Sequence, residues 1–162
     1  MEEVTIALGS NLGDRLTEIK RAGTFLNSIS ETPVLKASIW ESEPVGGAKF
    51  SFLNTMAIIT THLEPEELLQ ELKEFEHLSG RARNPVRWAP RILDLDIIYY
   101  GNRVIQVKNL KIPHPEIQNR LFVLLPLQEI DKNRTDPVSG LTLDRLIKKA
   151  PKMDIHKTNH TW

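Results

Sequence analysis

The chain has 162 residues, a length that suits one domain with a proper core and no need of disulfides. Lysine plus arginine and aspartate plus glutamate each number 21, so the net charge is zero, whereas proteins that bind nucleic-acid backbones normally carry a basic excess. The absence of cysteine excludes disulfides and thiolate metal sites, and no stretch approaches the roughly 20 apolar residues of a membrane span. We therefore expect a cytoplasmic monomer with one domain, residues 1–162, and no nucleic-acid or membrane partner.

The pattern of apolar residues in the N-terminal half predicts a strand, a helix and two further strands. The apolar run at 4–8 ends at a glycine and is typical of a short buried strand. A helical stripe with spacings of three and four follows Asp14 and comprises Leu16, Ile19, Gly23 and Leu26. Residues 34–40 and 52–61 are rich in β-branched and aromatic side chains and predict strands, while the polar, glycine-rich segment 43–49 predicts a flexible loop.

The next part of the chain repeats this pattern. Pro65 suits the first position of a helix, whose apolar face comprises Leu68, Leu69, Leu72, Phe75 and Leu78. Residues 92–100 predict a strand that turns at Gly101 into a segment at 103–107. The order strand–helix–strand–strand–helix–strand predicts an α+β fold, a ferredoxin-like split βαβ sheet with helices packed on it.

The C-terminal end should elaborate this frame. We expect one short helix from Glu116 and another at 143–150, with Pro126 limiting the first because proline interrupts helical hydrogen bonding.

Asp94 and Asp96 are the first candidates for chemistry. Side chains alternate along a strand, so Leu93, Leu95 and Ile97 would face the core while both carboxylates reach the opposite surface. Two carboxylates this close repel each other unless a cation lies between them. A bare Asp-x-Asp also fits a solvated strand face, but an isolated carboxylate pair on a buried strand would be costly. The pair is therefore a candidate magnesium site.

An arginine-rich segment directly precedes this pair. It carries Arg81, Arg83, Arg87 and Arg91 within eleven residues and contains no acid. Such a run can be a solvated loop, but Pro85, Trp88 and Pro90 are unusual in one. Guanidinium groups bind phosphate oxygens through a planar fork, so we interpret the segment as an anion-binding lid.

Two weaker groups of candidates lie elsewhere. His114 and Arg120 would become phosphate or substrate contacts if their loop lies beside Asp94. Ser42, Phe52, Asn54 and Phe122 form the other group, in which Asn54 could present its amide to a flat heterocycle between aromatic faces; ordinary core packing is the alternative.

The turn Gly9-Ser10-Asn11-Leu12-Gly13 is not a P-loop, since it lacks the lysine that reaches phosphates. An ATP-using protein of this sequence would not bind the nucleotide in the P-loop manner.

Taken together, these motifs resemble one family, 6-hydroxymethyl-7,8-dihydropterin pyrophosphokinase of folate biosynthesis. The matching stretches are Ala7–Asn11, Phe52–Asn54, Gly80–Arg83, Arg87–Ile97, Pro113–Pro115 and Asn119–Phe122. The run Arg-Trp-x-Pro-Arg-x-Leu-Asp-Leu-Asp is the most specific of them.

The resemblance implies transfer of pyrophosphate from ATP to the hydroxymethyl oxygen of a reduced pterin, with release of AMP. It implies that two Mg²⁺ ions are bound by Asp94 and Asp96. It assigns Arg81 and Arg91 to the transferred phosphates and Arg83 to the same loop. The implied ATP-site residues are Glu76, Arg87, Ile97, His114 and Arg120, and the implied pterin-site residues are Gly9, Ser42, Val45, Phe52, Asn54 and Phe122. Because no histidine is clearly placed to accept the hydroxyl proton, Asp96 is our hypothesis for the acceptor.

The chain departs from the common pattern of that family at a few positions. Phe52 stands where tyrosine is common, Ser42 replaces threonine, and Glu43 occupies a position often taken by proline; Asn109 and Lys111 replace residues that hold ATP in some members. The alternative functions are another metal-dependent nucleotidyl or glycosyl transferase that uses Asp-x-Asp, and an RNA-binding ferredoxin-like module.

Overall fold

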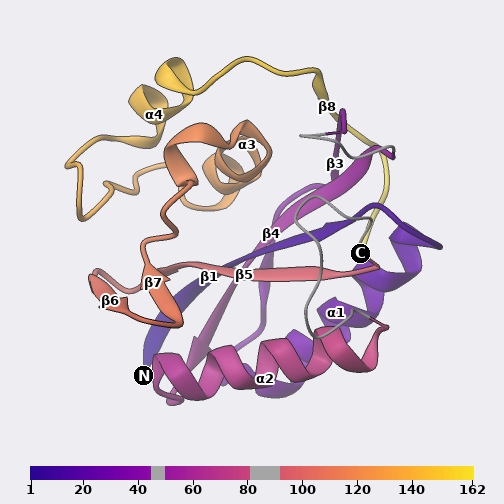
Figure 1. Ribbon diagram of the computed structural model, residues 1–162, viewed down its shortest axis with the longest axis horizontal. Coiled ribbons are helices and arrows are strands. Elements are labelled where there is room, and N and C mark those ends of the chain that lie inside the picture. The colour runs from indigo at the N-terminus through magenta and orange to yellow at the C-terminus, as the bar shows by residue number, and fades with distance from the viewer. Residues whose placement is uncertain (45–49, 81–91) are drawn as a thin grey trace.

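A computed structural model describes residues 1–44, 50–80 and 92–162 (Figure 1). Its centre is a six-stranded sheet with the order β5-β1-β4-β3-β8, in which β2 also pairs with β4. Every pairing in this sheet is antiparallel. The strands are β1 (Glu2–Ser10), β2 (Leu35–Lys36), β3 (Trp40–Ser42), β4 (Phe52–Thr61), β5 (Asp94–Tyr100) and β8 (Ile155–Lys157).

The predicted ferredoxin-like arrangement is confirmed. Two helices, α1 (Arg15–Ile29) and α2 (Pro65–Leu78), connect β1 to β2 and β4 to β5, and the central order β5-β1-β4-β3 is that of a split βαβ sheet. The segment predicted at 103–107 lies apart from this sheet. There β6 (Ile105–Val107) pairs with β7 (Leu110–Ile112) in a separate two-stranded sheet.

The helices α1 and α2 each begin at a capping residue. The Asp14 side chain accepts a hydrogen bond from the Thr17 amide (3.1 Å) at the start of α1. Glu64, directly before Pro65, forms a reciprocal capping box with Glu67 in the first turn of α2. The two helices cover one face of the sheet, and the core between them includes Val4, Ile6, Leu8, Ala22, Leu26, Leu68, Leu72, Leu95 and Ile97.

The expectation for Leu78 is wrong. This side chain is 74% exposed rather than part of the apolar face. The buried positions of α2 are Pro65, Leu68, Leu72 and Glu76. Since an α-helix turns by about 100° per residue, Leu78 lies about 120° away from Leu72 around the helix.

The other face of the sheet is covered by α3 (Leu121–Ile130), and α4 (Leu143–Lys149) packs against α3 on its outer side, as Figure 1 shows. The helix predicted from Glu116 is a 3₁₀ turn, Ile117–Asn119, followed directly by α3. Pro126 does not limit α3, which continues to Ile130. Proline removes one hydrogen bond there, while burial of Leu121, Val123, Leu124 and Leu127 stabilises the helix on both sides of it.

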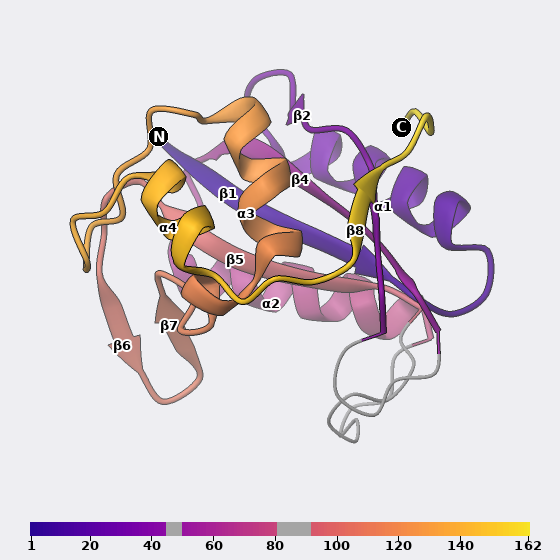
Figure 2. The same cartoon turned by 90° about the horizontal axis from the view of Figure 1, so that it is seen from above.

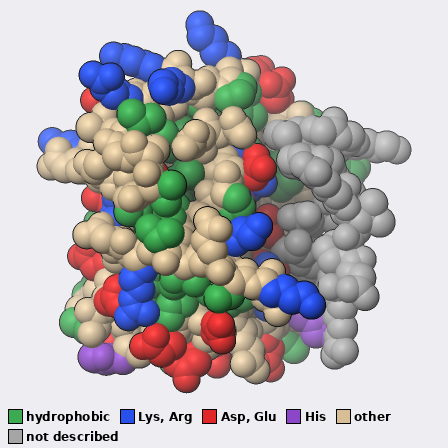
Figure 3. All heavy atoms as spheres, turned by 60° about the vertical axis from the view of Figure 1, so that its left-hand side comes forward, with side chains coloured by type: hydrophobic (Ala, Val, Ile, Leu, Met, Phe, Trp, Pro, Cys, Tyr) green, Lys and Arg blue, Asp and Glu red, His purple; other side chains and the backbone are tan. Residues whose placement is uncertain are grey.

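Charges on the surface are distributed to suit the helix ends. Glu66 and Glu67 lie in the first turn of α2, and Lys148 and Lys149 lie in the last turn of α4. Each pair complements the dipole of its helix. Figure 3 shows several basic side chains at the top of the view and acidic side chains mainly along its bottom, with further charges of both signs between them. No helix among the described residues is long and apolar enough to cross a bilayer.

Candidate active site

A row of aligned residues crosses the sheet at one end. Gly9 pairs with Asp94 on β5 and with Asn54 on β4, and Asn54 pairs in turn with Trp40 on β3. Residues directly opposite each other on neighbouring strands project to the same face. Strands lie about 4.8 Å apart, so Asp94 and Asn54 are separated by roughly 10 Å across Gly9. Residues from four distant segments therefore converge on one surface.

Asp96 lies two residues further along β5, on the face that carries Asp94. Leu95 and Ile97 are buried in the core against α1 and α2. Both carboxylates therefore project from the opposite face, the one covered by α3, as the alternation along the strand predicts.

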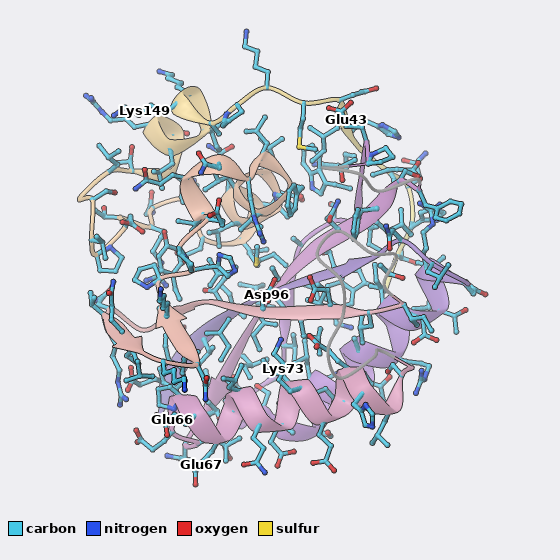
Figure 4. All side chains as sticks on the ribbon, viewed as in Figure 1. Glu43, Glu66, Glu67, Lys73, Asp96 and Lys149 are labelled. Carbon is cyan, nitrogen blue, oxygen red and sulfur yellow. The ribbon has the colours of Figure 1, made fainter. Side chains whose placement is uncertain are left out.

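The charge of Asp96 is unfavourable in this environment. Burial raises its pKa to about 7, and the neighbouring carboxylate of Asp94 adds to the shift. The cations of Lys73 and Arg120 offset this only in part, and Arg120 Nη1 lies 4.0 Å from Asp96 Oδ2. Figure 4 shows Asp96 on β5 with Lys73 reaching towards that strand from α2. A divalent cation would relieve the remaining repulsion.

Glu76 belongs to α2 and hydrogen-bonds the backbone of β5 between Asp94 and Asp96. Its side chain is buried, and Oε1 accepts a hydrogen bond from the Leu95 amide at 2.7 Å. Its Oε2 lies 3.5 Å from Lys73 Nζ. Because β5 is an edge strand of the sheet, this bond satisfies an amide that β1 does not use. Ile97 packs in the core, so a contact between this residue and a nucleotide would run through its backbone.

His114 and Arg120 lie on the carboxylate side of the sheet. The His114 amide donates to the Ile98 carbonyl (3.1 Å), and its Nδ1 accepts from the Glu116 amide (3.1 Å). Burial, together with the charge of Arg120, lowers the pKa of His114 to about 4, so its imidazole is neutral at pH 7. The Arg120 guanidinium lies 5.6 Å from the centre of the Phe122 ring. The two residues thus add one cation and one neutral imidazole near the carboxylates.

Polar and aromatic side chains meet on β3 and β4. Asn54 Nδ2 donates a hydrogen bond to Ser42 Oγ at 2.7 Å, and both side chains are buried. A Cβ atom on Gly9 would lie 3.5 Å from Asn54 Oδ1 and 3.6 Å from the Phe52 ring, so glycine keeps the space beside both open. Phe122 comes from α3, which packs on this face. An amide, a hydroxyl and two rings are groups that bind a flat, polar heterocycle.

The structure brings together the carboxylate pair and the candidate residues Gly9, Ser42, Phe52 and Asn54. Five candidates lie outside the described residues: Val45, Arg81, Arg83, Arg87 and Arg91. Sequence reasoning missed two residues near the site, Lys73 and Trp40. Lys73 lies about one helical turn before the candidate Glu76, and Trp40 lies two strand positions before the candidate Ser42. Residues at these spacings share a face, so the spacing could have revealed both.

On this ferredoxin-like sheet, a carboxylate pair lies on the same face as an amide, a hydroxyl and aromatic side chains, a combination typical of metal-dependent transferases. The model of the 7,8-dihydro-6-hydroxymethylpterin-pyrophosphokinase (HPPK) family matches residues 5–132, and the chain belongs to this family. The resemblance seen in the sequence is thereby confirmed.

Individual relatives agree with this assignment. The chain is 45% identical over 127 residues to the 2-amino-4-hydroxy-6-hydroxymethyldihydropteridine pyrophosphokinase of Bacillus subtilis, covering 77% of this chain and 75% of that protein. It is 38% identical to the Haemophilus influenzae enzyme of the same name, with coverage of 95% and 96%.

Solved structures show the same fold. The wild-type HPPK-DHPS of Plasmodium falciparum with pteroate superposes with a TM-score of 0.72 at 15% identity and covers 91% of this chain. This chain spans only 42% of that longer protein, and at this identity the likeness concerns the fold alone.

Proposed function

We propose that this chain transfers a pyrophosphoryl group from ATP to the hydroxymethyl oxygen of 6-hydroxymethyl-7,8-dihydropterin, a step of folate biosynthesis. The hydroxymethyl oxygen bonds to the β-phosphorus of ATP, the bond from that phosphorus to the α-phosphate oxygen breaks, and AMP leaves. The observation that carries the proposal is the row from Asp94 through Gly9 to Asn54. It supports the proposal because the carboxylate of Asp94 and the amide of Asn54 lie on one face of the sheet, where a cation and the pterin could be bound side by side.

Asp94 and Asp96 would hold magnesium, and we propose two ions. The pair fits this role because its oxygens share one face and the pKa of Asp96 is raised by burial and by the second carboxylate. No group of three or more histidine, aspartate or glutamate side chains that could hold a metal occurs among residues 1–44, 50–80 and 92–162. Two carboxylates suffice, since Mg²⁺ usually keeps waters and substrate phosphates as its other ligands. When bound, the ions would neutralise the triphosphate and make the hydroxyl more acidic.

The remaining residues would bind and orient the two substrates. Asn54 and Ser42 would hydrogen-bond the polar edge of the pterin, and the rings of Phe52 and Phe122 would contact its faces. On the ATP side, Arg120 contributes charge and the neutral His114 a hydrogen bond, while Glu76 holds β5 in position.

The remaining roles in the reaction are binding of the transferred phosphates and acceptance of the hydroxyl proton. Arg81 and Arg91 would bind the transferred phosphates, with Arg83, Arg87 and Val45 in supporting positions that follow from the resemblance. Asp96 is our proposed acceptor of the hydroxyl proton, because it lies on the pocket face of β5 next to Asp94. Positioning and charge neutralisation then supply most of the catalysis.

Mass spectrometry of the products tests this function. The protein mixed with MgATP and the reduced hydroxymethylpterin should yield AMP and a diphosphorylated pterin in equal amounts. A nucleotidyl or glycosyl transferase would leave the pterin without a diphosphate. An RNA-binding module would need an exposed sheet face for base stacking, but α3 packs on that face here.

A further inference from the structure

The C-terminal tail adds a strand to the edge of the sheet beside the acceptor pocket. Residues 151–162 lie beyond residue 132, where the family match ends. After α4 the chain crosses the molecule to β8 (Figure 2). There it pairs with β3, with Ser42 opposite Ile155 and Trp40 opposite Lys157. Without β8, the three-residue strand β3 would be an edge held in the sheet by β4 alone. The tail therefore makes β3 an interior strand.

Glu43 and Asp154 join the tail to the end of β3 through two hydrogen bonds. The Glu43 amide donates to the Asp154 carbonyl at 3.0 Å. In return, the Asp154 amide donates to Glu43 Oε1 at 3.1 Å. A proline at position 43 would offer neither an amide nor a side-chain acceptor. We call this reciprocal pair the Glu43–Asp154 latch.

The far end of the tail is anchored independently. Both the amide and the hydroxyl of Thr158 donate to the Ile39 carbonyl, at 2.9 and 2.7 Å. Trp162 Nε1 donates to the Ala37 carbonyl at 2.8 Å, and its ring lies so close to Gly23 that a Cβ there would be 3.0 Å from it. The tail is thus fastened on both sides of β3, and the latch lies at the residue directly after Ser42.

Ser42 connects the latch to the acceptor pocket. It directly precedes Glu43 in the chain, and its hydroxyl accepts the hydrogen bond from the Asn54 amide. A shift of β3 would therefore displace the hydroxyl that orients Asn54. On the other side, Glu129 of α3 binds the Trp40 indole at 2.6 Å and lies 3.6 Å from Lys157 Nζ, so α3 contacts both strands.

We propose that β8, fastened by the Glu43–Asp154 latch, positions Ser42 and Asn54 for pterin binding, so that Glu43 and Asp154 are positioning residues of the acceptor pocket. The inference rests on the proposed function, because it assigns these residues to the same acceptor site. When the latch is open, only a fraction of the molecules holds a competent pocket, and the apparent affinity for the pterin falls by that fraction.

The test measures pterin affinity in four full-length variants, in the presence of Mg²⁺ and α,β-methylene-ATP, which prevents transfer. Glu43→Pro removes both bonds and should weaken pterin binding by about tenfold. Glu43→Ala and Asp154→Pro each remove the same side-chain bond and should weaken it by about threefold. Glu43→Gln keeps an amide and an acceptor and should bind as the unaltered protein does. Affinity for the nucleotide and kcat at saturating pterin should stay unchanged in all four, which a general folding defect would not allow.

Two further readouts make the test decisive. In Glu43→Pro the His156 amide, which lies in the middle of β8 opposite Glu41, should exchange with solvent faster, while the Thr158 amide keeps its separate bond to Ile39. The double variant Glu43→Ala/Asp154→Pro should be no weaker than either single variant, because both remove one bond. Unchanged pterin affinity in Glu43→Pro, or equal losses of pterin and nucleotide affinity, would overturn the inference. Failure of the unaltered protein to bind the pterin at all would instead overturn the proposed function, and the inference with it.

Discussion

Removing the charge of Asp96 should stabilise the metal-free protein at alkaline pH. The pKa of this carboxyl rises from 3.8 to about 7, first because of burial and then because of Asp94. At about 1.36 kcal/mol per pKa unit, this shift corresponds to roughly 4 kcal/mol. The side chain is 26% exposed, so solvent screening reduces the effect, and we expect Asp96→Asn to gain on the order of 1–4 kcal/mol above pH 7.

The sign of the pH dependence follows from the direction of the shift. A carboxyl whose pKa is higher in the folded state binds its proton more tightly there. Asp96 therefore costs nothing below about pH 4, and its cost grows as the pH rises to 7 and then stays constant. The stability difference between Asp96→Asn and the unaltered protein should follow the same curve.

Urea denaturation at several pH values between 4 and 8.5, without metal, measures this difference. Glu71→Gln is the matched control, since it makes the same chemical change at an exposed position of α2. Mg²⁺ at a concentration well above its Kd should stabilise the unaltered protein but not Asp96→Asn. If Asp96→Asn is no more stable than the unaltered protein at pH 8, the carboxylate pair is not electrostatically strained and our reasoning about the metal site is refuted.

Three more substitutions separate the roles in the site. Asp94→Ala should abolish Mg²⁺-dependent ATP binding in isothermal titration calorimetry; binding that persists in excess Mg²⁺ would remove Asp94 from the metal site. Arg91→Ala should slow turnover by a factor on the order of 10³ while the urea midpoint stays unchanged, and near-normal turnover would exclude Arg91 from the mechanism. Asn54→Ala removes the amide that Ser42 orients and should raise KM for the pterin by about tenfold or more, with KM for MgATP within about twofold. A parallel rise in both KM values would place Asn54 outside the acceptor pocket.

The frame and the carboxylate pair could be predicted from the sequence because both rest on local periodicity. Alternation along residues 92–100 was enough to place Asp94 and Asp96 on one face, and helical spacing was enough to find α1 and α2. Periodicity failed where a single residue decided the outcome. Leu78 continues the apolar composition of α2 but not its buried face, and Pro126 lies inside a helix that burial stabilises.

The assembly of the site could not be predicted from local pattern. That Gly9 lies between Asp94 and Asn54 depends on the register of two strand pairs that join distant parts of the chain. The role of Glu76 depends on β5 being an edge strand with an amide to satisfy. The tail, in particular, carries a three-residue strand too short to give a periodic signal, and its partners lie more than 100 residues earlier in the chain.

Tracing the α- and γ-phosphates of ATP tests the central claim most directly. With ATP labelled at the α-phosphorus or at the γ-phosphorus, the account predicts that the γ label moves to the pterin with the whole pyrophosphoryl group and that the α label stays in AMP. An α label in the pterin product would show nucleotidyl transfer, and release of the γ label as orthophosphate without a labelled pterin would show simple hydrolysis. Either result would contradict pyrophosphoryl transfer by this site.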